Sequence, residues 1–505
     1  MKSSIAGKLR HPHFPCSRDQ TTCTAPVVSC IIFDAYPLCG YNISRRNEGQ
    51  SSGVYSIRMM NLTDIGYGLG VGISAPYWLL KPSARRKVLA AFEQRSGRVL
   101  PERDLSKPAI LIHAVSVGEI NATRSLCVLL KQARPDLHLI LSTTTETGFA
   151  RATELYGLAS DVSVIRYPLD FSSAVSRVLD GLRPAVVVLM ELEVWPNFLS
   201  QCADRGIPVV LANGRLTLPS YKRYAMLGPV SRAMFTKLSA VCAQDELYAD
   251  RFMQLGAIPD RTRVLGTMKF DNASVGDSVP GDEALARDVG LGLPPGVTST
   301  QQAPAWVCGS TGPGEEAMIL RQYRALLERH PRLRLVIVPR HPQRFDEVAQ
   351  LIEQHRFKVV RRSRPVLQPV DTPVQPVVLG DTMGELRKFY SLADVVFVGR
   401  TLVDLGPRQH GSDMIEPAAL GKPVIVGPFT GNFAEVMRKF VAHEAMLVAP
   451  DEAALGESVS VLIGSPDQRA FMGMRAQEVV SANQGSTARH ARLILEKLME
   501  LEGMG

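Results

Sequence analysis

Short apolar runs alternate with amphipathic stretches along the chain from residue 107 onward. The runs are rich in Val, Ile and Leu, and the stretches between them, such as Ile120–Arg134 and Asp245–Leu255, have the spacing of helices. Strands joined by helices of this length predict a parallel, doubly wound α/β sheet. The first group of predicted strands is Ala109–Val115, Leu137–Ser142, Val162–Tyr167, Ala185–Met190, Val209–Ala212, Ala240–Ala243 and Arg263–Leu265.

The alternation stops at residues 272–304, which are rich in Gly, Pro, Ser and Thr and hold at most one short helix. A second alternation follows, with a loop-like interruption at residues 364–376 and a helical tail at Asp467–Glu502. Its predicted strands are Ala305–Cys308, Leu333–Pro339, Val377–Leu379, Val395–Val398, Val424–Val426 and Met446–Val448. The pattern predicts two Rossmann-like domains, 101–271 and 305–505, that are joined by a linker and face one another across a cleft.

The first 100 residues follow a different pattern. Residues 1–58 have neither strand nor helix period, and we interpret them as a poorly ordered extension or a mis-annotated start, with the true start at Met60 or nearby. Ile65–Leu80 carries no charged side chain, and a basic cluster follows at residues 81–87. The apolar stretch is shorter than the ~20 residues that span a bilayer. Residues 60–100 are therefore predicted to be a membrane-proximal anchor, spanning or interfacial, and the alternative is an apolar packing segment of the body.

The overall composition adds little to this picture, but the distribution of charge along the chain changes it. Hydrophobic residues make up 45% of the 505 positions, which is ordinary for a globular protein. The formal charge of +8 lies entirely within the first 100 residues. Because the remaining body is neutral, it is a poor binder of nucleic acid, and the basic excess indicates a membrane surface instead. The cysteines after the first 40 residues lie in apolar runs and are predicted to be buried thiols: Cys127, Cys202, Cys242 and Cys308.

Polar residues that follow the predicted strands are the candidates for chemistry in the first domain. Glu119 lies in His113-Ala-Val-Ser-Val-Gly-Glu119, where a strand gives way to a helix, and a carboxylate there can act as a general base. The alternative is a glutamate that merely favours the start of a helix. Glu191 and Glu193 follow another strand, and both can point into the cleft only if the chain turns. Asn213 and Arg215 follow the next strand.

The second domain offers small and basic residues in the same positions. Small residues after a strand let a phosphate approach backbone N–H groups, and an arginine there can bind it. The candidates are Ser310 and Thr311 in a G-S-T-G loop, Arg340 and His341 after the next strand, Gly384 and Glu385 at a helix start, and Glu416, which could hold sugar hydroxyls.

Several common motifs are absent from the sequence. It has no D-x-D, no G-x-x-x-x-G-K-[ST] phosphate loop and no H-E-x-x-H, and its first strand–helix turn is not G-x-G-x-x-G. A classical dinucleotide dehydrogenase and a zinc hydrolase are therefore disfavoured. The sequence predicts neither a metal ion nor a cofactor.

The motifs, in their order, resemble those of the lipid A Kdo (3-deoxy-D-manno-octulosonic acid) transferases. The resemblance runs from about Met60 to the end of the chain. It rests on HAVSVGE, STTTETG, YPLD, MELEVWPN, NGRLTLPS, GTMKFD, CGSTGPGEE, PRHPQR, TMGELRKFY, FVGRTLV and IEPAALGKPVIVGP.

This resemblance implies a GT-B fold and a metal-independent enzyme on the cytoplasmic face of the inner membrane. The enzyme would transfer Kdo from CMP-Kdo to a lipid A precursor with inversion at the anomeric carbon. Glu119 would be the general base and the first domain would hold the acceptor. The second domain would bind CMP through Arg340, His341, Gly384, Glu385 and Glu416, with weaker assignments for Ser310, Thr311 and Lys269.

One stretch departs from the family pattern G-G-H-N-x-x-E-P. Here it reads His410-Gly-Ser-Asp-Met-Ile-Glu-Pro417, so that Ser412 and Asp413 replace the His and Asn. A carboxylate beside a nucleotide phosphate is unfavourable unless it is paired or faces a sugar or base. Two alternatives to a Kdo transferase stay open. One is a GT-B glycosyltransferase that uses another nucleotide-activated sugar, and the other is a membrane-attached binding protein without activity.

Overall fold

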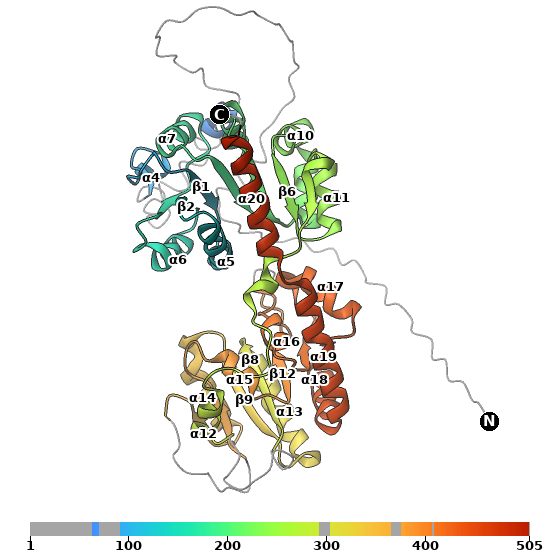
Figure 1. Cartoon of the computed structure of the whole chain (residues 1–505). Helices are drawn as coiled ribbons and strands as arrows, with labels where there is room; N and C mark the ends of the chain where they lie inside the picture. Colours follow the sequence, from blue (N-terminus) through green and yellow to red (C-terminus); the bar gives the residue numbers. More distant parts are fainter. Residues whose placement is uncertain (1–62, 70–90, 292–302, 365–374, 407–408, 504–505) are drawn as a thin grey trace, which may run out of the picture.

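The computed structural model describes residues 63–69, 91–291, 303–364, 375–406 and 409–503. These residues form two separate seven-stranded sheets, one in each half of the chain (Figure 1). Every strand pairs in parallel with its neighbours. The predicted pair of doubly wound α/β sheets is confirmed.

The N-terminal sheet has the order β3-β2-β1-β4-β5-β6-β7. Its strands are β1 (Ala109–His113), β2 (His138–Thr143), β3 (Val162–Arg166), β4 (Val186–Met190), β5 (Val209–Gly214), β6 (Ala240–Ala243) and β7 (Thr262–Val264). The order reverses between β1 and β4. At such a switch point the loops that follow the two strands diverge and leave room for a ligand.

The C-terminal sheet has the order β10-β11-β9-β8-β12-β13-β14, with its switch point between β8 and β12. Its strands are β8 (Ala305–Thr311), β9 (Arg334–Pro339), β10 (Val359–Arg361), β11 (Val377–Leu379), β12 (Val395–Val398), β13 (Val424–Val426) and β14 (Leu447–Val448). All the predicted strands are present. The additional strand β10 was not predicted, because a three-residue edge strand carries almost no apolar pattern.

Helices cover both faces of each sheet, so that β1 and β8 are buried along their whole length. This burial explains why the strands are continuous apolar runs rather than alternating ones. The helices of the N-terminal half are α4 (Phe92–Arg95), α5 (Val117–Ala133), α6 (Glu146–Tyr156), α7 (Ser172–Leu182), α8 (Pro196–Asp204), α9 (Leu218–Met226), α10 (Pro229–Phe235) and α11 (Glu246–Gln254). Those that follow are α12 (Asp282–Asp288), α13 (Glu315–Arg329), α14 (Phe345–Gln354), α15 (Leu386–Ser391), α16 (Ile415–Ala419), α17 (Ala434–Ala442), α18 (Glu452–Gly464), α19 (Pro466–Asn483) and α20 (Ser486–Glu502).

Two helices cross the expected division of the chain. α12, within the segment predicted as a linker, places Leu285 and Val289 in the core of the C-terminal half. α20 leaves that half and packs Ile494 and Leu498 against the N-terminal sheet (Figure 1). The two halves are therefore connected by the C-terminal helix as well as by the segment around residue 272.

The start of the predicted anchor is attached to the body. Residues 63–69 are helical, and Tyr67 donates a hydrogen bond to Asp170 over 2.9 Å. The N–H of Ser172, at the start of α7, donates to Asp64 over 2.8 Å. Residues 70–80 of the apolar stretch lie outside the described residues. Among the helices that the structure does describe, none combines the length and the apolar character that a membrane crossing requires.

The prediction that the cysteines beyond residue 40 are buried is confirmed. The thiols of the four cysteines beyond residue 40 are buried and free.

Candidate functional site

Glu119 lies in the first turn of α5, directly after β1 and beside the switch point of the N-terminal sheet. The sequence Ser116-Val-Gly-Glu119 forms a capping box, in which the Ser116 hydroxyl accepts from the Glu119 N–H. In return, the Glu119 carboxylate accepts from the Ser116 hydroxyl over 2.8 Å and from the Val115 N–H over 2.9 Å. The helix start thus holds the carboxylate in one orientation.

The electrostatic surroundings of Glu119 suit a general base. Burial, together with the nearby Glu191 carboxylate, raises the pKa of Glu119 to about 7, although the hydrogen bonds from Val115 and Ser116 oppose this rise. A carboxylate that titrates near neutral pH is ionised in part and can accept a proton effectively. His113, in the same motif, is different: burial lowers its pKa to about 3, and its Nδ1 contacts the Ser142 carbonyl oxygen at 3.0 Å, as a neutral packing residue does.

Glu191 and Glu193 lie in the turn after β4, on the other side of the switch point. The chain does turn, because Glu191 has a φ of +57°. Both carboxylates raise the pKa of Glu119, so both lie in its electrostatic environment. The pKa of Glu191 is itself raised by burial, against the lowering effect of Lys269 and Arg215. The pKa of Glu193 is also raised by burial, and Glu193 accepts a hydrogen bond from the Trp195 indole at 3.2 Å.

Asn213 is a structural residue that connects segments distant in the sequence. Its side-chain oxygen accepts from the N–H of Met268 over 3.1 Å, which fixes the segment that carries Lys269. Its own N–H donates to His490 of α20 over 3.0 Å. Asn213 is almost fully buried, with 2% exposure, so it supports the site from beneath.

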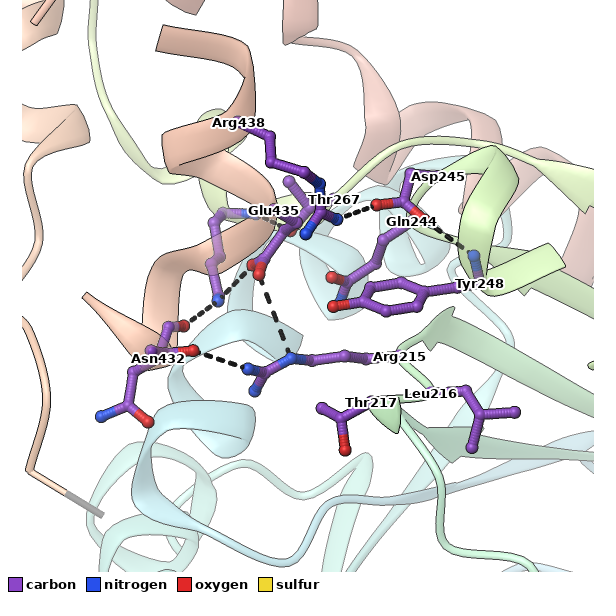
Figure 2. Close-up of polar contacts among 12 residues, drawn as sticks. Arg215, Leu216, Thr217, Gln244, Asp245, Tyr248, Thr267, Asn432, Glu435 and Arg438 are labelled. Carbon is purple, nitrogen blue, oxygen red and sulfur yellow. Dashed lines mark hydrogen bonds and ion pairs between the residues drawn. The ribbon is translucent and has the colours of Figure 1, made fainter. Parts of the chain in front are cut away.

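Lys269 and Arg215 contact residues of the C-terminal half from the N-terminal half, and Figure 2 shows Arg215 beside Glu435 and Asn432. The Lys269 ammonium lies 2.6 Å from the Glu435 carboxylate of α17 and donates to the Asn432 carbonyl over 2.9 Å. Arg215 donates to the Gly431 carbonyl over 3.1 Å, and its Nε is 4.0 Å from Glu435. The structure thus places Lys269, predicted to bind the donor, in an ion pair between the halves.

A second ion pair, between Asp245 and Arg438, lies beside the first (Figure 2). Asp245 follows β6, Arg215 follows β5, and Glu435 and Arg438 follow β13. The contacts therefore bring the carboxyl edges of the two sheets toward each other. Sequence reasoning missed Glu435 and Arg438, because nothing in a helical pattern identifies a partner in the other half.

Ser310 and Thr311 end β8 at the switch point of the C-terminal sheet, and both are buried. The loop that follows is held by Glu315, whose fully buried carboxylate accepts four backbone N–H groups. The donors are Gly312 (2.8 Å), Arg400 (2.7 Å), Thr401 (2.9 Å) and Leu402 (2.9 Å). Glu315 therefore joins the loop after β8 to the loop after β12.

Three basic residues surround this pair of loops. Arg340 and His341 follow β9, as the sequence predicts, and both are exposed. Burial lowers the pKa of His341, and the charges of Arg400, Arg340 and Arg344 lower it further. Sequence reasoning missed Arg400, although it follows an apolar strand just as Arg340 does, and that signal was available.

Asp413 and Glu416 form an acidic pair near the same edge. Burial raises the pKa of Glu416 to about 7, and the Asp413 carboxylate contributes to this shift. Asp413 accepts from the Ile415 N–H over 2.9 Å at the start of α16. Burial raises the pKa of Asp413, although the positive charges of Lys269 and Arg340 oppose this rise. A backbone donor and nearby cations therefore offset part of the cost of burying the carboxylate at this departure from the family pattern.

Gly384 and Glu385 precede the short helix α15. Gly384 has a φ of +81° and open space where a side chain would begin. The Glu385 carboxylate accepts from Arg362 over 2.9 Å and from Thr382 over 2.6 Å. Although burial opposes it, these contacts lower the pKa of Glu385. The carboxylate thus holds this loop together, which leaves the backbone as the part that a ligand can contact.

Left-handed backbone conformations concentrate at the two switch points. Non-glycine residues rarely adopt a positive φ, and such strain clusters at functional sites. In the N-terminal half, Glu191 directly after β4 and Asn213 within β5 have a positive φ. In the C-terminal half, Ser310 within β8 and Arg400 after β12 have a positive φ. The geometry thus singles out three residues that the sequence proposed and one that it missed.

Two doubly wound sheets meet at their carboxyl edges, with acids on one and guanidinium groups on the other, in a GT-B-like arrangement. Residues 90–272 match a family model described as 3-deoxy-D-manno-octulosonic-acid transferase. The chain is 36% identical over 383 residues to the 3-deoxy-D-manno-octulosonic acid transferase of Haemophilus influenzae, covering 75% of this chain and 85% of that protein. It is 34% identical over 387 residues to the Bordetella pertussis enzyme of the same name, with the same coverage.

A solved structure, the C-terminal CMP-Kdo binding domain of WaaA from Acinetobacter baumannii, is 29% identical with a TM-score of 0.34 and covers 39% of this chain and 95% of that one. The identities to the Haemophilus and Bordetella enzymes show that the chain belongs to the 3-deoxy-D-manno-octulosonic acid (Kdo) transferase family.

Proposed function

We propose that this protein transfers Kdo from CMP-Kdo to a lipid A precursor in lipopolysaccharide core biosynthesis. Its membership of the Kdo transferase family supports the reaction. The observation that carries the mechanism is Glu119, a carboxylate with a pKa of about 7 at the switch point of the N-terminal sheet. It stands where an acceptor hydroxyl can lose its proton.

The reaction then balances as a single displacement. The ionised Glu119 takes the proton of the acceptor hydroxyl while that oxygen forms a bond to the anomeric carbon of Kdo. The bond from this carbon to the phosphate oxygen breaks on the opposite face, which inverts the configuration. CMP leaves with its negative charge, which the guanidinium of Arg340 and the nearby basic residues stabilise.

The basic residues near the phosphate make a metal ion unnecessary for stabilising the charge of the leaving group. Arg340 places positive charge at the edge of the C-terminal sheet, and its charge contributes to the lowered pKa of the neighbouring His341. Fixed cations of this kind can stabilise a departing phosphate in the way a bound metal does.

We expect turnover to continue in EDTA at a rate within about twofold of that in Mg²⁺, because fixed guanidinium groups need no ion. Initial rates of CMP release in the two buffers provide the measurement. An EDTA-treated enzyme that recovers activity only when Mg²⁺ or Mn²⁺ is added back would contradict a metal-independent mechanism.

The lipid acceptor gives the N-terminal region a purpose. The contacts of Asp64 and Tyr67 attach residues 63–69 to the N-terminal half, next to the apolar stretch that the sequence predicts as an anchor. The basic cluster that follows would face anionic lipid on the cytoplasmic leaflet. We therefore propose that the enzyme works at the cytoplasmic face of the inner membrane.

A donor comparison separates this function from the alternative of another activated sugar. We expect release of CMP from CMP-Kdo generated in situ with a tetra-acylated lipid A precursor, and release of neither UDP from UDP-glucose nor CMP from another CMP-sugar. Equal or faster turnover with a different CMP-sugar would show that the loop around Ser412 and Asp413 has changed the donor.

The acid limb of the pH–rate profile reports the ionisation of Glu119. The base works only when it is deprotonated, so kcat/KM should rise with pH up to about 7 and then level off. Glu191→Gln removes a neighbouring negative charge, so the pKa of Glu119 should fall and the limb should move to lower pH. Glu246→Gln, at the exposed start of α11, serves as the matched control. A limb that stays in place or moves upward in Glu191→Gln would contradict the assignment.

A further inference from the structure

Arg400 and Arg340 lie on either side of the loop after β8. Arg400 follows β12 and Arg340 follows β9, and β8 pairs with both of these strands. Across the described part of the chain, neither guanidinium lies within ion-pair distance of a carboxylate. The Nε atom of Arg400 is buried without any hydrogen-bond partner. Two cations without an ion-pair partner among the described residues therefore flank the switch point of the C-terminal sheet.

The position of Arg400 is fixed by the fold. Its N–H donates to the buried Glu315 carboxylate over 2.7 Å, and its φ is +59°. Its side chain lies across the loop after β8, because a Cβ at Gly312 would approach the Cγ of Arg400 to 3.0 Å. The guanidinium of Arg400 is therefore held in place by three features. They are the positive φ of its backbone, the hydrogen bond to the buried Glu315, and the absence of a side chain at Gly312 on the facing loop.

The two arginines influence each other and their neighbour. Burial lowers the pKa of Arg400, and the charge of Arg340 lowers it further. The pKa of the neighbouring His341 is lowered by partial desolvation and then by the charges of Arg400, Arg340 and Arg344. Bringing an anion between the arginines would relieve this repulsion. The arrangement suits a ligand with two negative groups close together.

We infer that Arg400 binds the carboxylate that the donor sugar carries on its anomeric carbon, while Arg340 binds the phosphate. This inference rests on the proposed function. Kdo is a 2-ulosonic acid, so its C2 atom carries both the carboxylate and the oxygen that leads to the phosphate of CMP. The carboxylate and the phosphate of the donor are thus attached to the same carbon, the carboxylate directly and the phosphate through one oxygen. Two neighbouring arginines can therefore each bind one of these anions. A guanidinium binds a carboxylate through two parallel hydrogen bonds, which fixes the sugar as well as attracting it.

Arg400 therefore determines specificity: it selects an acidic sugar and orients the anomeric carbon. The phosphate and the carboxylate are distinguished by comparing CMP, which has only the phosphate, with CMP-Kdo, which has both. Arg400→Gly is the informative variant, because glycine adopts the positive φ of this position without strain and so preserves the loop. Arg356→Gly is the matched control, since Arg356 is an exposed arginine with a φ of +61° that precedes β10 at the opposite edge of the sheet.

We expect Arg400→Gly to raise the KM for CMP-Kdo by about 10-fold to 100-fold, the effect of losing a charge-assisted pair of hydrogen bonds. The inhibition constant of CMP should change by less than about twofold, because the phosphate still binds Arg340. Arg400→Lys should recover part of the loss, and Arg356→Gly should match the wild type in both constants.

Each other outcome has one meaning. Equal weakening of CMP and CMP-Kdo in Arg400→Gly would assign Arg400 to the phosphate and overturn the inference. An unchanged KM, in an enzyme that transfers Kdo, would also overturn it while leaving the proposed function intact. A wild-type protein that binds CMP but transfers no Kdo would refute the proposed function itself and this inference with it.

Discussion

Replacing Glu119 by alanine is expected to lower the rate of Kdo transfer by about 10²–10⁴-fold, the contribution of a positioned general base. The loss should appear in kcat, because the proton is transferred in the chemical step. CMP binding should survive, since Glu119 belongs to α5 of the N-terminal half and the proposed CMP site belongs to the other half. Rates with saturating acceptor and titration calorimetry with CMP provide the two measurements.

A structural role for Glu119 makes a different prediction. Its carboxylate also completes the capping box at the start of α5, so alanine should cost about 1 kcal/mol of stability. Glu119→Gln keeps an oxygen for that role but cannot take a proton. The Glu119→Gln protein should be as stable as the wild type but inactive in Kdo transfer. Near-normal turnover in Glu119→Gln would show that the carboxylate is only a cap, and Glu246→Gln should change neither property.

Replacing Glu315 by alanine is expected to lower the free energy of unfolding by about 4 kcal/mol and to abolish CMP binding. The carboxylate is fully buried and accepts four backbone N–H groups from two loops. Alanine would leave these donors without partners, and each unmet buried donor costs about 1–3 kcal/mol unless water reaches it. The loop after β8, where the phosphate is proposed to bind, would lose the contact that holds it.

Denaturant unfolding and CMP calorimetry on Glu315→Ala measure these effects. The matched control is Glu328→Ala, an exposed glutamate in the last turn of the same helix. Glu315→Gln should lie between the two, because an amide keeps one acceptor oxygen and turns the other into a donor. A Glu315→Ala protein as stable as Glu328→Ala would mean that the four hydrogen bonds do not hold the loops together.

The strands and the position of the site could be predicted from the sequence because both follow from local rules. A strand buried on both faces must be a continuous apolar run, as Val395–Val398 is. Polar residues directly after such runs must lie at the carboxyl edge of a parallel sheet, which is why Glu119, Glu191 and Arg340 were found.

The remaining features depend on contacts between distant segments. The amphipathic pattern of α20 shows that one face is buried but not that the N-terminal sheet covers it. The pairing of Lys269 with Glu435 joins residues 166 apart, and no local pattern encodes it. The positive φ of Arg400 is set by the Glu315 hydrogen bonds to its loop, so the sequence could show an arginine after a strand but not its fixed position.

The most direct test of the account is the mass of the lipid acceptor after reaction. A tetra-acylated lipid A precursor would be incubated with the protein and CMP-Kdo generated in situ, with EDTA present, and analysed by mass spectrometry. We predict that the acceptor gains the mass of one or more Kdo residues with the wild type and none with Glu119→Ala. An unmodified acceptor, with wild-type protein that is folded and binds CMP, would contradict the assignment as a Kdo transferase.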